Sequence, residues 1–320
     1  MAADRGTEQD CRMFAEVDMG RPAVDAGKVP LAWSGVRASK VLASEEGEGA
    51  MLVELEDGLV VVKMGGTDVA GEVAAAALAR ELGVYAPCVR AVKSAGEEGK
   101  ELRSELGAVA GSFNPEIGEE VDLKRRYATY AVTKKAFALV CDFCQGRPVA
   151  EADGAALERI GAWEEVGRIC AFDALINNRD RVPVVWDNAG NAGNMLFGAE
   201  RVAAIDQQVS CRFAGGQDLL DAYIERVGAA LRDPPVERVV DFFSSAGHEM
   251  SADEQVAWTS GFNAMTLIIG GDVARWKEVV RSVRAAVDAQ FAGGAVDNTA
   301  DVNVDALDRL LDAFAAAVVH

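Results

Sequence analysis

The stretch LINNRDRVPVVWDNAGNAGNMLFGAERVAAIDQ, residues 175–207, decides the fold of this chain. It places Asp180 in a polar loop, Asn194 directly before the short apolar run 195–197, and Asp206 directly after a second such run. Short apolar runs of this kind predict a pair of small strands. Because magnesium prefers hard oxygen ligands and keeps several waters, one asparagine and one aspartate at neighbouring strand ends are enough to hold it. The stretch therefore predicts a Mg²⁺ site at Asn194 and Asp206.

The chain that follows this stretch has an almost entirely helical pattern. Apolar residues recur there at helical spacing, and Ser251-Ala-Asp-Glu254 is a capping box, which marks a helix start. The same spacing directly before the polar loop predicts one long buried helix. The predicted helices are 155–176, 218–231, 236–244, 252–269, 273–291 and 304–319, and the two predicted strands between them are 195–197 and 202–205.

The N-terminal half has the pattern of a sheet with one helix. Short Val-rich or alternating runs bounded by Gly, Asp or Pro predict strands, and Asp57-Gly58 is a two-residue hairpin signal that pairs the first two of them. Residues 67–82 instead hold strong helix formers, with acids in the first turn and Gly83 as a stop. The predicted strands are 50–56, 59–64, 88–92 and 138–143.

Two charged residues of this half complete a set of polar groups. Lys63 ends an apolar strand and Glu72 lies in the next helix. A strand lysine, a helix glutamate, a loop aspartate, an asparagine before a short strand and an aspartate after the next is the order in protein-kinase-like phosphotransferases. Phosphoryl transfer needs a cation for the nucleotide phosphates, an acid to aim it, oxygen ligands for Mg²⁺ and a carboxylate to orient the attacking hydroxyl. Each residue alone has a structural explanation, such as a solvated strand-edge lysine, but their joint order indicates a kinase fold.

Three motifs resemble one branch of that superfamily. They are Leu175-Ile-Asn-Asn-Arg-Asp-Arg-Val-Pro183, the Gly-Asn-Ala-Gly-Asn that ends at Asn194, and Ile205-Asp-Gln207. Together they are similar to the catalytic domain family of actin-fragmin kinase, whose catalytic loop is also similar to those of phosphoinositide kinases. The resemblance runs from about Trp33 to about Phe213.

The resemblance implies ATP and Mg²⁺ as cofactors. It assigns the catalytic role to Asp180, with Arg181 beside it, and the metal to Asn194 and Asp206. The implied reaction moves the γ-phosphoryl group to a Ser/Thr hydroxyl of a protein, with actin or an actin-capping complex as the first acceptor to consider. A phosphoinositide or small-molecule kinase is one alternative, and a non-catalytic binding module on a kinase scaffold is another.

The remaining nucleotide contacts are assigned mostly by order along the chain. Lys63, held by Glu72, is expected to face the α and β phosphates. The link between the lobes is expected to bind adenine through its backbone, around Asp142, Phe143 and Cys144.

The phosphate-binding loop departs from the usual pattern. No Gly-X-Gly-X-X-Gly precedes the strand lysine. The favoured substitute is Ser34-Gly-Val-Arg-Ala-Ser39, which puts Ser34 and Gly35 near the phosphates, and the other candidate is Glu46-Gly-Glu-Gly49. Asp-Phe-Gly and Ala-Pro-Glu motifs are also missing, so an ordinary phosphorylated activation segment is not expected.

These assignments place the chain in the α+β class. We expect a two-lobed protein-kinase-like fold, with an antiparallel sheet and one main helix in the N-lobe and a mostly helical C-lobe. Residues 1–30 are expected to form an N-terminal extension, residues 31–146 the nucleotide-binding N-lobe, and residues 147–320 the C-lobe with the catalytic and metal-binding loops.

Composition narrows the partners. The chain has 32 basic against 51 acidic side chains and a net charge of −19, which argues against a nucleic-acid partner and favours a basic or mixed-charge acceptor face. No segment has the pattern of a secretory signal or of a membrane span, so we expect a cytoplasmic protein, cytoskeleton-associated if actin is its acceptor. The pair Cys141-Asp-Phe-Cys144 lacks the second ligand pair that a zinc site needs, and Trp186 is assigned to packing.

Overall fold

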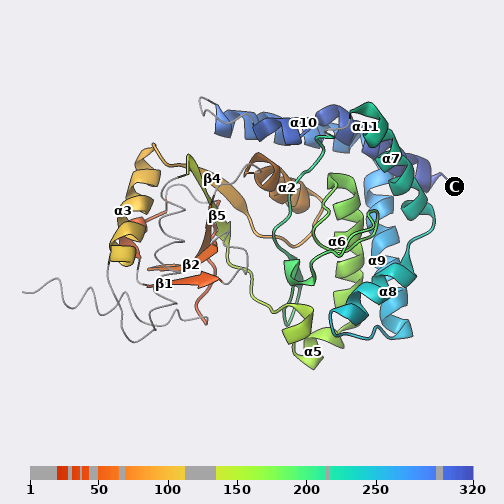
Figure 1. The fold of residues 1–320 in the computed structure, drawn as a ribbon, viewed down its shortest axis with the longest axis horizontal. Helices are drawn as coiled ribbons and strands as arrows, with labels where there is room; N and C mark the ends of the chain where they lie inside the picture. The colour runs from red at the N-terminus through yellow and green to blue at the C-terminus, as the bar shows by residue number, and fades with distance from the viewer. Residues whose placement is uncertain are drawn as a thin grey trace, which may run out of the picture. The chain divides into compact units, whose positions relative to one another are not determined.

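The chain is α+β, with an antiparallel sheet in its N-terminal part and a mostly helical C-terminal part, an arrangement compatible with a kinase-like fold (Figure 1). Two compact units can be separated: a sheet unit, Met1–Val69 with Cys88–Phe143, and a helical unit, Ala70–Pro87 with Cys144–His320. The computed structural model describes residues 20–27, 31–36, 38–42, 50–64, 69–111, 135–213, 216–292 and 298–319.

The sheet has five strands in the order β1-β2-β3-β5-β4, and every neighbouring pair is antiparallel. The β2–β3 hairpin closes with Leu55 opposite Gly58, so its turn is Glu56-Asp57, one residue earlier than the hairpin signal predicts. The strands are β1 (Ala38–Leu42), β2 (Ala50–Leu55), β3 (Gly58–Met64), β4 (Val89–Lys93) and β5 (Phe137–Asp142).

A glycine at the start of β3 allows the N-terminal segment to pair with the sheet. Gly58 has a φ of 145°, and a Cβ there would overlap the carbonyl oxygen of Pro22. Leu59 donates its N–H to Pro22 (2.9 Å) and accepts from Val24 (2.9 Å). Val24 and Ala26 are buried in the core of the sheet unit. Part of the stretch 1–30, expected to be an extension, thus belongs to the sheet unit.

A second helix in the N-terminal half, α3 (Glu97–Gly111), was not predicted. Its first turn carries Glu98, whose carboxylate accepts hydrogen bonds from Leu31 N–H (3.3 Å), from Trp33 Nε1 (3.1 Å) and from both terminal nitrogens of Arg90. Burial raises the pKa of Glu98, but the hydrogen bonds and charge of Arg90, with the bonds from Trp33 and Leu31, outweigh it and lower the pKa overall.

Glu98→Gln should therefore remove a pH-dependent part of the stability. An acid with a lowered pKa stabilises the fold above its ordinary value of 4.5 and loses this contribution as pH falls through the folded-state pKa. We expect the variant to lose about 1–3 kcal/mol at pH 7, and its unfolding free energy to fall less steeply than that of the wild type below pH 4.5. Denaturant unfolding at several pH values measures this. The exposed neighbour Glu97 provides the control, Glu97→Gln, and equal pH slopes in all three proteins would refute the expectation.

The helical unit is built around α6 and α9, which pack side by side, with α11 against α9 and α7, and α10 against α11 (Figure 1). The helix predicted over 155–176 is divided at residues 158–159, where Trp163 Nε1 donates to the carbonyl of Leu157 (2.9 Å). The elements are α2 (Val69–Glu81), α5 (Gly154–Leu157), α6 (Ile160–Ile176), β6 (Met195–Phe197), β7 (Val202–Ala204), α7 (Gln217–Arg232), α8 (Val236–Ser245), α9 (Ala252–Gly271), α10 (Val273–Phe291) and α11 (Val304–Val318).

Two glycines let α6 and α9 approach closely. A Cβ at Gly167 would overlap the carbonyl oxygen of Trp258, and a Cβ at Gly261 would overlap that of Glu164. Both obstacles are helix backbone, which cannot move aside as a flexible side chain can. The helix pair that carries the polar loop is therefore held at a spacing that only glycine permits.

Gly167→Ala should destabilise the helical unit by about 1–3 kcal/mol, because overpacking forces the two backbones apart. Thermal or denaturant unfolding measures the loss. Gly161→Ala on the same helix is the matched control: the nearest atom to a Cβ there is Arg159 Nη1 at 3.8 Å, so the methyl group fits. Equal stabilities of the two variants would contradict the close-packing argument.

Among the described residues, no helix has both the length and the apolar composition to cross a membrane.

Candidate active site

The polar loop starts from the way α6 ends. Asn177 caps the helix in the left-handed conformation, with a φ of 54°, and its N–H donates to the carbonyl of Asp173. An asparagine tolerates this conformation better than most side chains, so the residue type explains the stop. Asn178 turns back as well: its N–H bonds the Asp173 carbonyl (3.0 Å), and its Nδ2 donates to Asp173 Oδ1 (3.0 Å). The loop therefore leaves the helix in a defined direction.

Asp180 is exposed and is held by Asn194. Nδ2 of Asn194 donates to the carbonyl oxygen of Asp180 (2.7 Å) and to its Oδ2 (3.0 Å). Asn194 is 5% exposed and lies at the end of a 3-10 turn, η4 (Ala192–Asn194), whose cap is the side chain of Asn191. The structure thus brings together two of the residues that the sequence predicts for the site.

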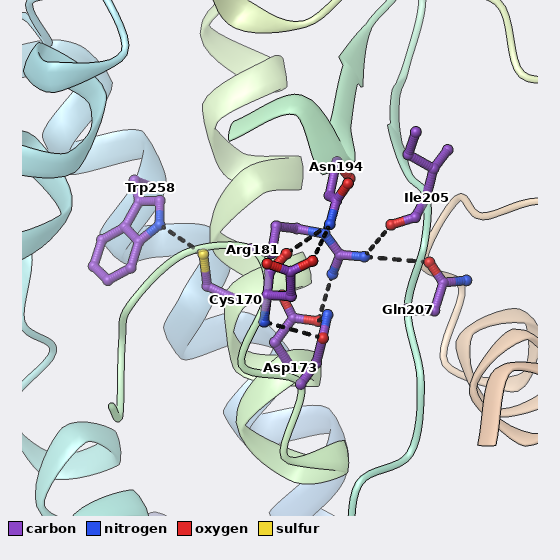
Figure 2. Close-up of polar contacts among 9 residues, drawn as sticks. Cys170, Asp173, Arg181, Asn194, Ile205, Gln207 and Trp258 are labelled. Atoms are coloured by element: carbon purple, nitrogen blue, oxygen red, sulfur yellow. Dashed lines mark hydrogen bonds and ion pairs between the residues drawn. The ribbon is translucent and has the colours of Figure 1, made fainter. Parts of the chain in front are cut away.

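Arg181 connects three segments of the site. Its side chain is completely buried, and Figure 2 shows its guanidinium between three segments. Nε donates to the carbonyl of Asn194 (3.1 Å), and Nη2 donates to the carbonyl of Ile205 (2.8 Å) and to Oε1 of Gln207 (3.3 Å). Nη1 forms an ion pair with Asp173 of α6. One buried side chain therefore ties the long helix to both predicted metal-binding segments.

Asp206 lies between the two residues that Arg181 holds. Its φ is 57°, and among the described residues other than glycine only Asn177 shares a positive φ. Left-handed backbone is uncommon for such residues, and strain of this kind collects at functional sites, where the surrounding structure enforces it. Here the enforcement comes from Arg181, which binds the residues on both sides of Asp206.

The carboxyl of Asp180 has a raised pKa. Desolvation is the largest cause, the hydrogen bond from Asn194 opposes it, the negative charge of Asp206 adds to it, and the charge of Arg181 opposes it. Asp206 is therefore near enough for the two carboxylates to repel each other. The carboxylate of Asp206 and the amide oxygen of Asn194 are donors that Mg²⁺ prefers, and a divalent cation would relieve the repulsion between Asp180 and Asp206, so the residues present fit the metal.

Residues 24–212, more than half of the 320-residue chain, match the family model described as actin-fragmin kinase, catalytic. The chain belongs to this family. A search of the curated proteins gives no match. Members of an actin-fragmin kinase catalytic domain family are kinase-type phosphotransferases, and such a domain implies ATP and usually a divalent metal. The family predicted from the three motifs is confirmed.

The strand lysine and the helix glutamate of this kinase domain lie in different units. Lys63 is on β3, opposite Ala50 of β2 and Leu139 of β5. Glu72 is half-buried in the first turn of α2. That turn is fastened to the segment after Asp206, because the carbonyl of Gly71 accepts from the N–H of Val209 (3.0 Å). The roles of Lys63 and Glu72 therefore remain predictions from their order along the chain.

The residues expected to bind adenine have other contacts. The carboxylate of Asp142 accepts from the N–H groups of Ala26 (2.6 Å) and Cys88 (2.9 Å), and its own N–H donates to the carbonyl of Cys88 (3.1 Å). Burial raises the pKa of Asp142, against these two hydrogen bonds. Phe143 packs on Leu52 and Leu59 of the sheet, whereas Cys144 is buried in the helical unit. The main-chain N–H of Asp142 is therefore already bonded within the sheet unit, and the adenine-binding role of the link stays a prediction.

The favoured phosphate-binding stretch is tied to α3. Ser34 and Gly35 lie in a 3-10 turn, η1 (Trp33–Gly35), and the N–H of Ser34 donates to Glu101 Oε1 (3.1 Å). A phosphate bound there would compete with that carboxylate for the N–H. The alternative stretch, Glu46–Gly49, lies outside the described residues.

Three positioning residues were missed by the sequence analysis: Asp173, Asn178 and Gln207. Asp173 had a usable signal, because it is the single charged residue in the apolar run Ile169-Cys-Ala-Phe-Asp-Ala-Leu-Ile176. Its Oδ2 has no hydrogen-bond partner among the described residues, and Asp173 lines a cavity of about 10 Å³ together with Asn178, Trp186 and Tyr223. A space of this size holds about one water, so it is not the nucleotide site.

Proposed function

We propose that this chain transfers the γ-phosphoryl group of ATP to the hydroxyl of a serine or threonine in a protein. One observation supports the proposal most directly. A single buried arginine, Arg181, forms hydrogen bonds to the segments that contain predicted site residues. It directly follows Asp180, binds the carbonyl of Asn194 and binds both neighbours of Asp206. Phosphoryl transfer depends mainly on positioning and charge stabilisation, so such a rigid arrangement suits it.

Each residue has a separate task in the proposed reaction. Asp180 orients the acceptor hydroxyl and takes its proton; a raised pKa brings a carboxylate nearer to the working pH of a base. Asn194 and Asp206 would hold Mg²⁺, which neutralises charge on the β and γ phosphates when bound. Arg181 is buried away from any substrate, so it positions the other groups. Lys63, aligned by Glu72, binds the α and β phosphates.

Actin, or an actin complex, is the first acceptor to test because the matched family is that of actin-fragmin kinase. Phosphoinositide kinases, the alternative, share the Asn-Arg-Asp-Arg and Ile-Asp-Gln motifs. However, an anionic membrane surface would repel a chain of net charge −19. We therefore propose a protein acceptor in the cytoplasm, associated with the cytoskeleton through its substrate.

Thermal unfolding with and without Mg·ATP, followed by transfer of labelled γ-phosphate, tests the proposal. We expect Mg·ATP to raise the melting temperature, and label to reach actin in preference to casein or phosphoinositide vesicles. Asp206→Asn should weaken nucleotide binding in the presence of Mg²⁺ by about tenfold or more, because it removes a charged metal ligand. Asp187→Asn, an exposed acid of the same polar loop, is the control.

The outcomes separate the candidate functions. A thermal shift without any transfer would leave a nucleotide-binding module and overturn the enzyme proposal. Transfer to phosphoinositides alone would replace the protein acceptor by a lipid. The absence of both a shift and a transfer would exclude nucleotide chemistry at this site.

A further inference from the structure

The loop between Asp180 and Asn194 is longer than phosphoryl transfer requires. Residues 181–193 separate the two, whereas protein kinases have four residues at this point. The loop is ordered around Trp186. Its indole Nε1 donates to Asn177 Oδ1 (2.7 Å), and its ring stacks on Tyr223 of α7, with centroids 5.2 Å apart and planes 9° from parallel. Residues 181–193 therefore form an ordered surface beside the candidate active site.

Three exposed arginines converge on this tryptophan, and we call them the arginine cluster. The guanidinium carbon of Arg179 lies 4.1 Å from the Trp186 ring centroid, and that of Arg226 lies 5.4 Å from it. Nη1 of Arg238 donates to the carbonyl of Trp186 (3.3 Å). The three residues come from the polar loop, from α7 and from α8. Segments distant in sequence thus gather positive charge at one place.

None of the three arginines forms an ion pair with an acid among the described residues, although the chain has 51 acidic side chains against 32 basic ones. Elsewhere in the helical unit acids do pair with arginines: Arg281 with Asp308 and Arg309 with Asp221. The cluster therefore holds three guanidinium groups outside any ion pair of the described residues, in a molecule whose net charge is −19.

The geometry leaves the cluster ready to bind an anion. A guanidinium that lies near the face of an indole ring is attracted to the ring and keeps N–H groups that can donate hydrogen bonds. Those groups match the two oxygens of a carboxylate. These contacts with Trp186 also restrict the side chains before a ligand arrives, which lowers the entropy lost on binding.

We propose that the arginine cluster binds an aspartate or glutamate of the acceptor protein, a few residues from the hydroxyl that is phosphorylated. The inference rests on the proposed function, because Arg179 directly precedes Asp180 and so places the bound carboxylate beside the acceptor hydroxyl. The substrate class is then a protein segment with acidic residues around its Ser/Thr. This local preference differs from the basic or mixed-charge acceptor that the net charge favours.

Two peptides that differ only in flanking residues test the inference. One carries Asp and Glu beside a threonine, and the other carries Asn and Gln there. Fluorescence anisotropy without nucleotide measures binding at low and high salt. We expect the wild type to bind the acidic peptide about tenfold more tightly, with the preference shrinking as salt screens the charges.

Arg226→Gln is the informative variant because Arg226 is exposed on α7 and lies outside the proposed catalytic groups. It should reduce the acidic preference about threefold to tenfold, whereas Arg226→Lys should keep part of it. Arg275→Gln is the matched control: Arg275 also lies over a tryptophan, Trp276, at 4.7 Å, but on α10. It should leave the preference unchanged. Melting temperatures check that all variants are folded.

The result that overturns the inference is equal binding of the two peptides, undetectable binding of both, or an acidic preference that survives in Arg226→Gln. Binding to phosphatidylserine vesicles in place of the acidic peptide would also overturn it, because the ligand would then be a membrane. Binding of the acidic peptide that depends on Arg226 but leads to no transfer of labelled phosphate would support the inference and count against the proposed function alone.

Discussion

Asp180→Asn should lower the rate of phosphoryl transfer by about 10²–10⁴-fold, the range for loss of a general base. Nucleotide binding should change little. The substitution removes a proton acceptor but keeps the shape, because an asparagine oxygen can accept the same hydrogen bond that Asn194 now gives to Asp180 Oδ2 at 3.0 Å. Single-turnover transfer of labelled phosphate, with nucleotide titration beside it, separates the two effects.

Asp187→Asn is the control for this prediction. It makes the same Asp-to-Asn substitution at another exposed acid of the same loop, so it corrects for the general loss of negative charge. We expect its transfer rate to stay within about twofold of the wild type, as for a surface residue without a special contact. A rate for Asp180→Asn that is as high as this control would remove Asp180 from the mechanism.

Asp173→Asn should destabilise the helical unit by about 3–5 kcal/mol, because it leaves the buried guanidinium of Arg181 without its counter-charge. Arg181 is fully buried, and Asp173 is 3% exposed. The other partners of Arg181 are carbonyl and amide oxygens, which satisfy hydrogen bonds but carry no full charge. Chemical denaturation measures the loss in unfolding free energy.

An exposed ion pair provides the comparison. Asp312 pairs with Lys277 at 2.7 Å and is 61% exposed, so Asp312→Asn should cost at most about 1 kcal/mol. If Asp173→Asn loses no more unfolding free energy than Asp312→Asn, the buried ion pair does not stabilise the arrangement of the site. The proposed function predicts a further effect, since Arg181 positions both metal-binding segments: the remaining folded Asp173→Asn protein should also bind Mg·ATP more weakly.

Much of the fold could be predicted because its signals are local. The helix predicted over 67–82, the helix that contains the capping box and the strand pair around residue 200 are all present, and each depends on a few consecutive residues. Capping and turn preferences act over three or four positions, so a sequence reader can find them. The helix α3 was missed because its three glycines, Gly99, Gly107 and Gly111, lower its helix propensity.

The candidate site likewise has residues that local sequence signals indicate and residues that they do not. Asp180, Asn194 and Asp206 were assigned to the site from their motifs and from their places at loop and strand ends, and this assignment stays a prediction. Asp173 is marked in the sequence as a single charge in an apolar run, but its role needed the structure, because the linear pattern does not name the counter-charge that it requires. That partner, Arg181, was assigned beside the catalytic aspartate from motif text, whereas its burial places it behind the site.

The sequence by itself determined the family and the class of reaction, and it proposed the three polar groups, since all of these depend on residue types in a fixed order. Only the tertiary structure decided which groups hold them in place. Arg181 gathers Asp173, Ile205 and Gln207 from three segments, and such long-range hydrogen bonds have no local signature. The arginine cluster at Trp186 has the same cause: folding brings together positive charges from α7, α8 and the polar loop, and thereby creates a local field that net charge conceals.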